Sequence, residues 1–323
     1  MKISVTDKNG GGIMLEFAAA IGASVDGRYF RIPQNKGGGY ITGFSWGKDM
    51  RMLLRHYYLN EEILLDRTNE LGEDQDDIVF VISGIFSSIV PAEVNLAAEI
   101  PNVLICRQAV SSLLTMPSNT AFSGITIAAS RTYLRGVFSN LSHPAMRSIL
   151  HSSEQFVFET GVSAQMISTA TEMLDSPIPE MLERHYYRLK CEELLCQAIA
   201  LLIQREENLM SNMHLEDIKS VYAVKISLQS NLDQPPNILS LARNSGMSEP
   251  KLRRLFKQTF GKGIFEYYQF MRMQEAARLL KGGRLTVSEV GYQLGFTNLS
   301  HFSRVFEQII GAKPKKYAAA NLQ

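Results

Sequence analysis

Cationic and polar side chains recur at helical spacing in two stretches near the C-terminal end of the sequence. In the first stretch they are Ser248, Pro250, Lys251, Arg253, Arg254 and Lys257. In the second they are Asn298, Ser300, His301, Ser303 and Arg304, followed by Lys313, Lys315 and Lys316. Lys and Arg neutralise nucleic-acid phosphates, and Arg, Asn and Ser bind the exposed edges of bases. The chemistry that these residue types favour is contact with a polyanion.

The individual roles stay open at this level. The residues favoured for base reading are Lys251, Arg253 and Arg254 in the first stretch, and Asn298, Ser300, His301 and Arg304 in the second. For each of them, a phosphate contact or plain solvation is an equal alternative. The three lysines that follow could hold phosphates or could simply face water.

The two stretches belong to an internal repeat. Gly261 matches Gly311, and Tyr267 matches Tyr317 at the same offset. In each copy the pattern predicts a short helix, a tight turn at a glycine and a second helix, over about 238–259 and 286–309. The residues expected to cap or stop these helices are Asn237 or Ser240, Gly246 and Ser248 in the first copy, and Thr286 or Ser288 and Gly295 in the second. A short helix, a turn and a cationic helix form the helix-turn-helix arrangement, in which the second helix enters a major groove.

Charge is distributed unevenly along the chain. From residue 221 to the end there are 15 Lys plus Arg against 6 Asp plus Glu, a net charge of +9. The whole chain carries +1, so the first 220 residues carry −8. This asymmetry predicts that double-stranded DNA binds the C-terminal part.

From about Val221 to Ala319 the chain resembles the DNA-binding domain of the AraC/XylS family of bacterial transcription regulators. The most specific run is Gly295-Phe296-Thr297-Asn298-Leu299-Ser300-His301-Phe302-Ser303-Arg304-Val305-Phe306. The resemblance implies two helix-turn-helix units joined by a linker helix, here Ile264 to Lys281. Glu307 departs from the pattern, because a basic residue is frequent there and the first copy has Lys257. We expect Glu307 to weaken phosphate contact at that point.

The first 130 residues contain short apolar runs separated by glycine-rich breaks. The runs that predict strands are Tyr40 to Trp46, Met52 to Leu59, Ile78 to Phe86, Val103 to Ala109 and Ile125 to Ala129. Their spacing favours a small antiparallel barrel or sandwich. Members of the resembled family often carry a cupin-like barrel here that binds an effector. If a small-molecule effector binds, Tyr40, Trp46, Arg55 and Tyr57 are the candidates to line its pocket; the alternative is that they fill the core or face water.

Residues 131–220 are dominated by helix signals. The longest predicted helix runs from Glu180 to about Glu207 and has a broad apolar stripe. The stripe contains Leu182, Tyr186, Leu189, Leu194, Ala198, Ile199 and Leu202. It could pack on the β domain or pair with a second subunit, so a homodimer stays open.

Several site classes are disfavoured by the residue types. His56 is the single histidine of the first 130 residues, and Cys106, Cys191 and Cys196 lack zinc-ligand spacing. Neither Gly10-Gly11-Gly12 nor Gly37-Gly38-Gly39 continues as a phosphate-binding loop. We therefore expect no metal, no cofactor and no enzyme activity. Without a signal peptide or an apolar run of membrane length, we expect a cytoplasmic protein with reduced cysteines.

Together the patterns predict an α+β chain. We expect a β-rich sensing domain at 1–130, a helical linker or dimerisation segment at 131–220 and an all-α DNA-binding domain at 221–320. The function that follows is sequence-specific DNA binding by a transcription regulator that also contacts RNA polymerase; an activator is the form expected, although the residues leave repression open. Two alternatives use the same DNA reader: a DNA-modifying or repair enzyme, and an architectural protein without an effector.

Overall fold

The computed structural model describes residues 2–7, 12–69, 77–86, 97–98, 101–107, 113–116, 118, 120–151, 155–175, 177–205 and 213–320. The chain divides into two compact units, Met1–Asn212 and Met213–Gln323. The resemblance in sequence begins at Val221, which lies in the middle of helix α6 (Leu215–Ser230). The boundary drawn from the sequence therefore cuts through a helix that belongs to the second unit.

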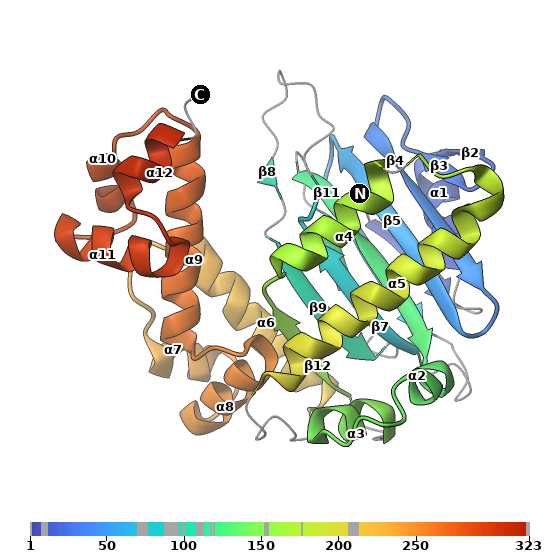
Figure 1. Cartoon of the computed structure of the whole chain (residues 1–323). Coiled ribbons are helices and arrows are strands. Elements are labelled where there is room, and N and C mark those ends of the chain that lie inside the picture. The colour runs from blue at the N-terminus through green and yellow to red at the C-terminus, as the bar shows by residue number, and fades with distance from the viewer. Residues whose placement is uncertain are drawn as a thin grey trace. The chain divides into compact units, whose positions relative to one another are not determined.

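A nine-stranded, mostly antiparallel sheet is the framework of the first unit (Figure 1). Eight strands follow the order β12-β9-β7-β11-β5-β4-β3-β2, and β8 pairs with β11. Their bounds are β2 (Ser24–Asp26), β3 (Tyr29–Arg31), β4 (Gly37–Trp46), β5 (Met50–Leu59), β7 (Asp77–Ser83), β8 (Ala97–Ala98), β9 (Asn102–Arg107), β11 (Thr120–Ser130) and β12 (Val157–Thr160). The antiparallel sheet predicted from the apolar runs is confirmed. One strand, β12, lies within the segment that sequence patterns assigned to helices.

A second sheet has three strands in the order β1-β6-β10. Here β1 (Lys2–Asp7) runs parallel to β6 (Ile63–Asn69), and β10 (Leu113–Met116) runs antiparallel to β6. Helix α1 (Gly12–Ile21) follows β1. This sheet joins segments distant in sequence, and the strand pattern alone did not predict it.

Strand β5 buries opposite faces in its two halves. Met50, Met52 and Leu54 lie in a large core, called here the helix-side core, whereas Tyr57 and Leu59 lie in a second core with residues of β1 and α1. The register of β5 with β4 and with β11 runs without interruption. Because successive side chains of a strand point to opposite faces, one continuous strand serves both cores.

The helix-side core is closed by helices. Met166, Ala170 and Met173 of α4 (Ala164–Asp175) pack into this core together with residues of α5 (Glu180–Ile203). The buried residues of α5 are Cys191, Leu194, Leu195, Ala198, Ile199 and Leu202. In Figure 1, α5 crosses the face of the sheet diagonally. The barrel expected from the sequence is not closed, since β12 and β2 end the strand order without pairing with each other; an amphipathic helix covers the apolar face instead.

Helix α5 uses its predicted apolar stripe only in part for this core. Leu194, Ala198, Ile199 and Leu202 are buried, but the side chains toward its N-terminal end face outward. Leu182 is 52% exposed and Leu189 is 65% exposed. The stripe therefore packs on the sheet at one end and leaves apolar surface uncovered within the described residues at the other.

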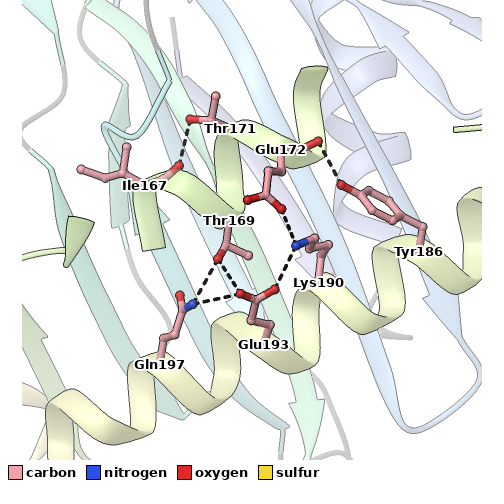
Figure 2. Close-up of polar contacts among 8 residues, drawn as sticks. All are labelled: Ile167, Thr169, Thr171, Glu172, Tyr186, Lys190, Glu193 and Gln197. Atoms are coloured by element: carbon pink, nitrogen blue, oxygen red, sulfur yellow. Dashed lines mark hydrogen bonds and ion pairs between the residues drawn. The ribbon is translucent and has the colours of Figure 1, made fainter. Parts of the chain in front are cut away.

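A polar network fastens α4 to α5 (Figure 2). The ammonium of Lys190 donates to Glu172 at 2.6 Å and to Glu193 at 3.0 Å. Thr169 donates to the other oxygen of Glu193 at 2.9 Å, and Gln197 donates to Thr169 at 3.1 Å. Burial alone would raise the pKa of Glu193, but the hydrogen bonds from Lys190 and Thr169 outweigh it and lower this pKa. Glu193 therefore takes part in this contact between α4 and α5 in its ionised form.

The second unit is all helical. Its helices are α6 (Leu215–Ser230), α7 (Ile238–Asn244), α8 (Glu249–Phe260), α9 (Ile264–Lys281), α10 (Val287–Gln293), α11 (Leu299–Ile310) and α12 (Pro314–Ala320). Helix α9 has the same bounds as the linker helix implied by the resemblance. Figure 1 shows α7 and α8 at one end of α9, and α10, α11 and α12 along the rest of it.

Candidate nucleic-acid interface

Each of the two predicted helix-turn-helix units is delimited by side-chain caps. Asn237 caps α7 by accepting from the backbone of Ser240 at 3.0 Å. Thr286 and Glu289 form a reciprocal capping box at the start of α10. Gly246 and Gly295 occupy the turns with φ of 66° and 76°, a region that glycine adopts without steric cost. The sequence predicted these caps and turns because they depend on neighbouring residues. Ser248 occupies the N-cap position of α8 as expected, but its side chain makes no capping hydrogen bond.

The repeat is also a repeat in three dimensions. Gly261 and Gly311 end α8 and α11 in the same left-handed conformation. Beyond these glycines, Tyr267 meets Phe256 edge to face with ring centroids 5.4 Å apart, and Tyr317 meets Phe306 in the same way at 5.6 Å. The two units are therefore two copies of one packing arrangement, with α8 and α11 in equivalent places.

The polar face of α8 carries the expected cations. Arg253, Arg254 and Lys257 are exposed, while Leu252, Leu255 and Phe256 on the opposite face are buried. Two cations contact carboxylates of the same unit: Arg253 donates to Glu249 at 2.8 Å, and Lys251 donates to Asp217 at 2.7 Å. The pair with Asp217 turns Lys251 toward α6 and separates it from the other three cations.

Sequence reasoning missed Asp217, because the segment before residue 221 was assigned to another domain. A signal was present: Glu216 and Asp217 lie in the first turn of α6, where acidic residues favour a helix start. Asp217 is well shielded from solvent, and its pair with Lys251 joins α6 to the candidate reading helix α8.

The polar face of α11 is less cationic. Ser300, His301 and Arg304 are exposed, and Ser303 is half-buried. Asn298 is the N-cap of α11, and its Oδ1 accepts from the backbone N–H of His301 at 3.0 Å. That capping bond leaves its amide NH₂ as the group that can donate to a base. The remaining candidates, Ser248, Pro250, Lys313, Lys315 and Lys316, are exposed.

A buried arginine joins the second helix-turn-helix to α9. Arg272 is 6% exposed, and its Nε donates to the carbonyl oxygen of Leu294 at 3.2 Å, with Nη2 donating to the same oxygen. Its guanidinium carbon lies 3.7 Å from the centroid of Phe296 and 5.0 Å from that of Tyr268. Burial lowers the pKa of Arg272 from its usual value. These contacts hold the turn of the second helix-turn-helix against α9.

The same turn receives the segment that precedes α7. A Cβ atom on Gly295 would lie 1.8 Å from the carbonyl oxygen of Asp233. Next to it, the carbonyl oxygen of Leu232 accepts from the hydroxyl of Tyr268 at 3.2 Å. The side chain of Leu232 packs against the core formed by α9, α10 and α11. The segment that leads into the first helix-turn-helix thus packs on the turn of the second helix-turn-helix, which fixes the two reading helices relative to each other.

The four candidate effector residues divide between the two faces of the sheet. Trp46 lies in the helix-side core and Tyr40 packs against it, while Tyr57 lies in the second core. Arg55 shares the face of Tyr57 because the two are two residues apart on β5. One of its nitrogens donates to Ser83 at 3.1 Å, and its buried Nε has no hydrogen-bond partner in the described part of the chain. The structure does not bring the four residues together into one site.

The environments of Cys191 and Cys196 favour the protonated thiol. Burial raises the pKa of Cys191 far above its usual value, and burial with nearby Glu192 raises that of Cys196. In the described ranges, no cluster of His, Cys, Asp and Glu could hold a metal ion. None of the described helices combines the length and the apolarity that crossing a membrane requires.

Comparison with known proteins gives the C-terminal region a family match. The helix-turn-helix domain family matches residues 241–320. A regulator from Rhizobium meliloti, "HTH-type transcriptional regulator GlxA", is 26% identical over 161 residues, 50% of this chain and 50% of that protein. The "HTH-type transcriptional activator RhaR" of Pectobacterium carotovorum is 25% identical over 156 residues, 48% and 55% of the two chains. The "Arabinose operon regulatory protein" of Escherichia coli is 30% identical over 138 residues, 42% and 46%. The chain spans about half the length of the curated relatives that it matches.

Solved structures also match. The DNA-binding domain of AdpA, in complex with a target DNA, is 25% identical, with a TM-score of 0.30, and covers 31% of this chain and 91% of that one. ToxT from Vibrio cholerae is 14% identical, with a TM-score of 0.32, and covers 84% of this chain and 98% of that one.

Proposed function

We propose that this chain, whose C-terminal unit is a double helix-turn-helix domain of the AraC/XylS family, is a sequence-specific DNA-binding regulator of transcription. The observation that carries the proposal is the structural repeat. Two equivalent helices, α8 and α11, each expose a polar face and bury an apolar one, and α9 fixes their separation. Reading helices held about 34 Å apart enter successive major grooves on one side of a duplex. One copy of the chain then reads a long site without palindromic symmetry.

Within this proposal the two helices divide the contacts unequally. Arg253, Arg254 and Lys257 make α8 the more cationic reader, which suits phosphate affinity. Ser300, His301 and Arg304 give α11 hydrogen-bonding groups for base edges, with the NH₂ of Asn298 beside them. Lys251 is assigned to positioning of α8 through its ion pair with Asp217.

The N-terminal unit is proposed to carry the effector or oligomerisation function. A ligand that binds one arrangement of this unit more tightly shifts the population of chains competent for DNA binding. We propose activation through contact with RNA polymerase; the printed name of RhaR, a relative over the C-terminal half, supports that direction. We propose a cytoplasmic localisation because bacterial DNA and RNA polymerase are in the cytoplasm. We propose no catalytic step, and the raised pKa values of Cys191 and Cys196 disfavour thiolate chemistry.

Homodimerisation through α5 is part of the proposal. The support is the outward-facing apolar pair Leu182 and Leu189, seven residues apart and so on one side of the helix. Leu182→Glu with Leu189→Glu should convert a dimer to a monomer in sedimentation equilibrium. Val25→Glu, which changes another exposed apolar residue of the same unit, is the control. A chain that is monomeric before substitution contradicts this part alone.

The central test is selection of DNA by the full-length chain. Fragmented genomic DNA of the host should yield a discrete motif with two parts about one helical turn apart. Affinity should fall steeply with salt, by about 10³-fold or more between 50 and 200 mM for six or more phosphate contacts. Recovery of fragments without a shared motif would contradict the specific-regulator proposal and favour the architectural alternative.

A further inference from the structure

The side chain of Arg28 lies among aromatic rings in the N-terminal unit. Its guanidinium carbon is 4.4 Å from the ring centroid of Phe44, 4.9 Å from that of Tyr29 and 5.5 Å from that of Tyr187. The rings come from β4, β3 and α5. A cation is attracted to the electron-rich face of an aromatic ring at such distances. The three rings therefore form an aromatic cage around one positive charge.

The walls of this aromatic cage also support one another. Phe44 stacks on Tyr187 with centroids 5.0 Å apart, and it stacks on Trp46 at 5.9 Å. Tyr29 meets Tyr40 edge to face at 5.5 Å. None of these ring contacts involves the side chain of Arg28, so the walls have packing partners besides their occupant.

The carboxylate of Glu183 completes the cage, but one nitrogen of Arg28 has no hydrogen-bond partner there. Nη2 of Arg28 donates to Glu183 at 2.8 Å and to the hydroxyl of Tyr29 at 3.0 Å. Nη1 is buried and has no hydrogen-bond partner in the part of the chain that the structure describes. A buried donor without a partner is unfavourable. This unsatisfied donor weakens the hold of Arg28 on the cage, whereas a free cation can orient its donors toward Glu183 and solvent.

The occupant is attached to a peripheral turn, unlike the walls Phe44 and Tyr187. Arg28 follows Gly27 in the turn between β2 and β3, and β2 is a three-residue end strand whose residues are all exposed. At Gly27 an added Cβ would meet nothing within 4 Å, so the turn is not packed there. Phe44 and Tyr187 instead lie on the long elements β4 and α5. Arg28 can thus leave the cage while Phe44 and Tyr187 stay in place.

We propose that this aromatic cage is a binding site for a small organic cation of the monoalkylguanidinium or primary alkylammonium class, and that Arg28 is a built-in competitor which the ligand displaces. The ring faces and the carboxylate of Glu183 favour a cation over a neutral molecule or an anion. The side chains of Arg28 and Glu183 are 23% and 24% exposed, so the site reaches solvent. Displacement breaks the ion pair that joins the β2–β3 hairpin to α5. The inference concerns the N-terminal unit and does not depend on DNA binding.

Trp46 provides the readout. It is the only tryptophan of the chain, it stacks on Phe44, and its indole N–H donates to the carbonyl oxygen of Arg184 on α5 at 3.0 Å. Ethylguanidinium chloride, titrated into the full-length chain at constant ionic strength, should change Trp46 fluorescence saturably. Arg28→Ala should lower the Kd about tenfold or more, because an attached competitor acts at an effective concentration in the millimolar range. Arg28→Gln, which keeps most of the side chain's length, should do the same if the alanine variant folds poorly.

Two further variants locate the binding. Lys36→Ala removes another cation of the same unit, one paired with Glu61 and not with the cage, and it should bind ethylguanidinium as the unmodified chain does. Phe44→Leu in the Arg28→Gln background should weaken binding about tenfold. A fluorescence change that never saturates in the unmodified chain overturns the proposal, and so does a Kd left unchanged by either Arg28 substitution. Equal binding with and without Phe44 overturns it as well.

Discussion

The guanidinium of Arg272 lies 3.7 Å from the ring centroid of Phe296 and donates to the carbonyl oxygen of Leu294 just before it. Arg272 belongs to α9, whereas Leu294 and Phe296 flank the glycine of the second helix-turn-helix turn. A single buried side chain thus binds the backbone end of α10 and the ring that follows it. The position of α11 depends on this contact, because α11 begins three residues after Phe296.

Arg272→Ala should destabilise the C-terminal unit by about 2–4 kcal/mol, because it removes charged hydrogen bonds and leaves the Leu294 carbonyl without this donor. Arg278→Ala, on the same helix but exposed and paired with Glu275, should change stability by about 0.5 kcal/mol or less. Urea unfolding followed by circular dichroism measures both. Equal effects of the two substitutions would mean that Arg272 is not part of the joint.

Gly295→Ala and Gly246→Ala form a matched pair in the two turns. Both glycines have positive φ, so each alanine should cost about 1 kcal/mol or somewhat more in backbone strain. Only at Gly295 does the added Cβ meet another backbone, the carbonyl of Asp233. We therefore expect a clearly larger loss of unfolding free energy for Gly295→Ala than for Gly246→Ala. Similar losses would show that the Leu232–Asp233 segment yields without cost.

Arg254→Ala and Arg304→Ala should each relax base preference at a different part of the selected DNA site, about one helical turn apart. Loss of a bidentate contact with a base costs about 1–3 kcal/mol of discrimination. Binding competition between the selected site and single-base variants gives the measurement. If either substitution weakens all sequences by the same factor, that arginine is a phosphate anchor.

Glu307→Lys should tighten DNA binding for all sequences alike. The change replaces an exposed carboxylate on α11 with the residue type that the first copy has at Lys257. One more phosphate contact steepens the dependence of log Kd on log salt by about 1. The reciprocal change, Lys257→Glu, should weaken binding and flatten the slope. A salt slope unchanged by both substitutions would remove these positions from the interface.

Glu193→Gln should weaken the joint between α4 and α5 in a pH-dependent way. The folded-state pKa of Glu193 is lowered, so its contribution is present above the unfolded value of about 4.3 and is lost as pH falls through the lower folded value. At pH 7 the expected loss is about 0.5–1 kcal/mol, since Glu193 is partly exposed. The difference from the unmodified chain should shrink near pH 3. Asp26→Asn, in a far more exposed pair with Arg31, should show little effect at either pH.

Local signals carried most of what the sequence could predict. The glycine turns depend on neighbouring residues and were predictable, and so were the caps to within the alternatives Asn237 or Ser240 and Thr286 or Ser288. The bounds of α9 came from the family resemblance. Contacts between distant residues were not. Arg28 and Glu183 are 155 positions apart, and no spacing rule connects them. The same holds for the parallel pairing of β1 with β6 and for Asp217 beside Lys251, which depend on how complete elements pack.

The prediction of a closed barrel was wrong for a similar reason. The buried face of β5 switches at Arg55 and His56, but nothing in the sequence says which core each half of the strand faces. The cover of the helix-side core comes from α5, more than a hundred residues later in the chain. A period-2 pattern reports that a face is buried, but not what buries it.

The matching contacts of Tyr267 and Tyr317 have a consequence for how the chain can change. Tyr267 closes the first copy from within α9, yet α9 is also the support on which the second copy is built. The two copies therefore share helix α9. Substitutions on α8 or α11 can change what each copy contacts, but a deletion of either copy that includes α9 would also remove core residues of the other.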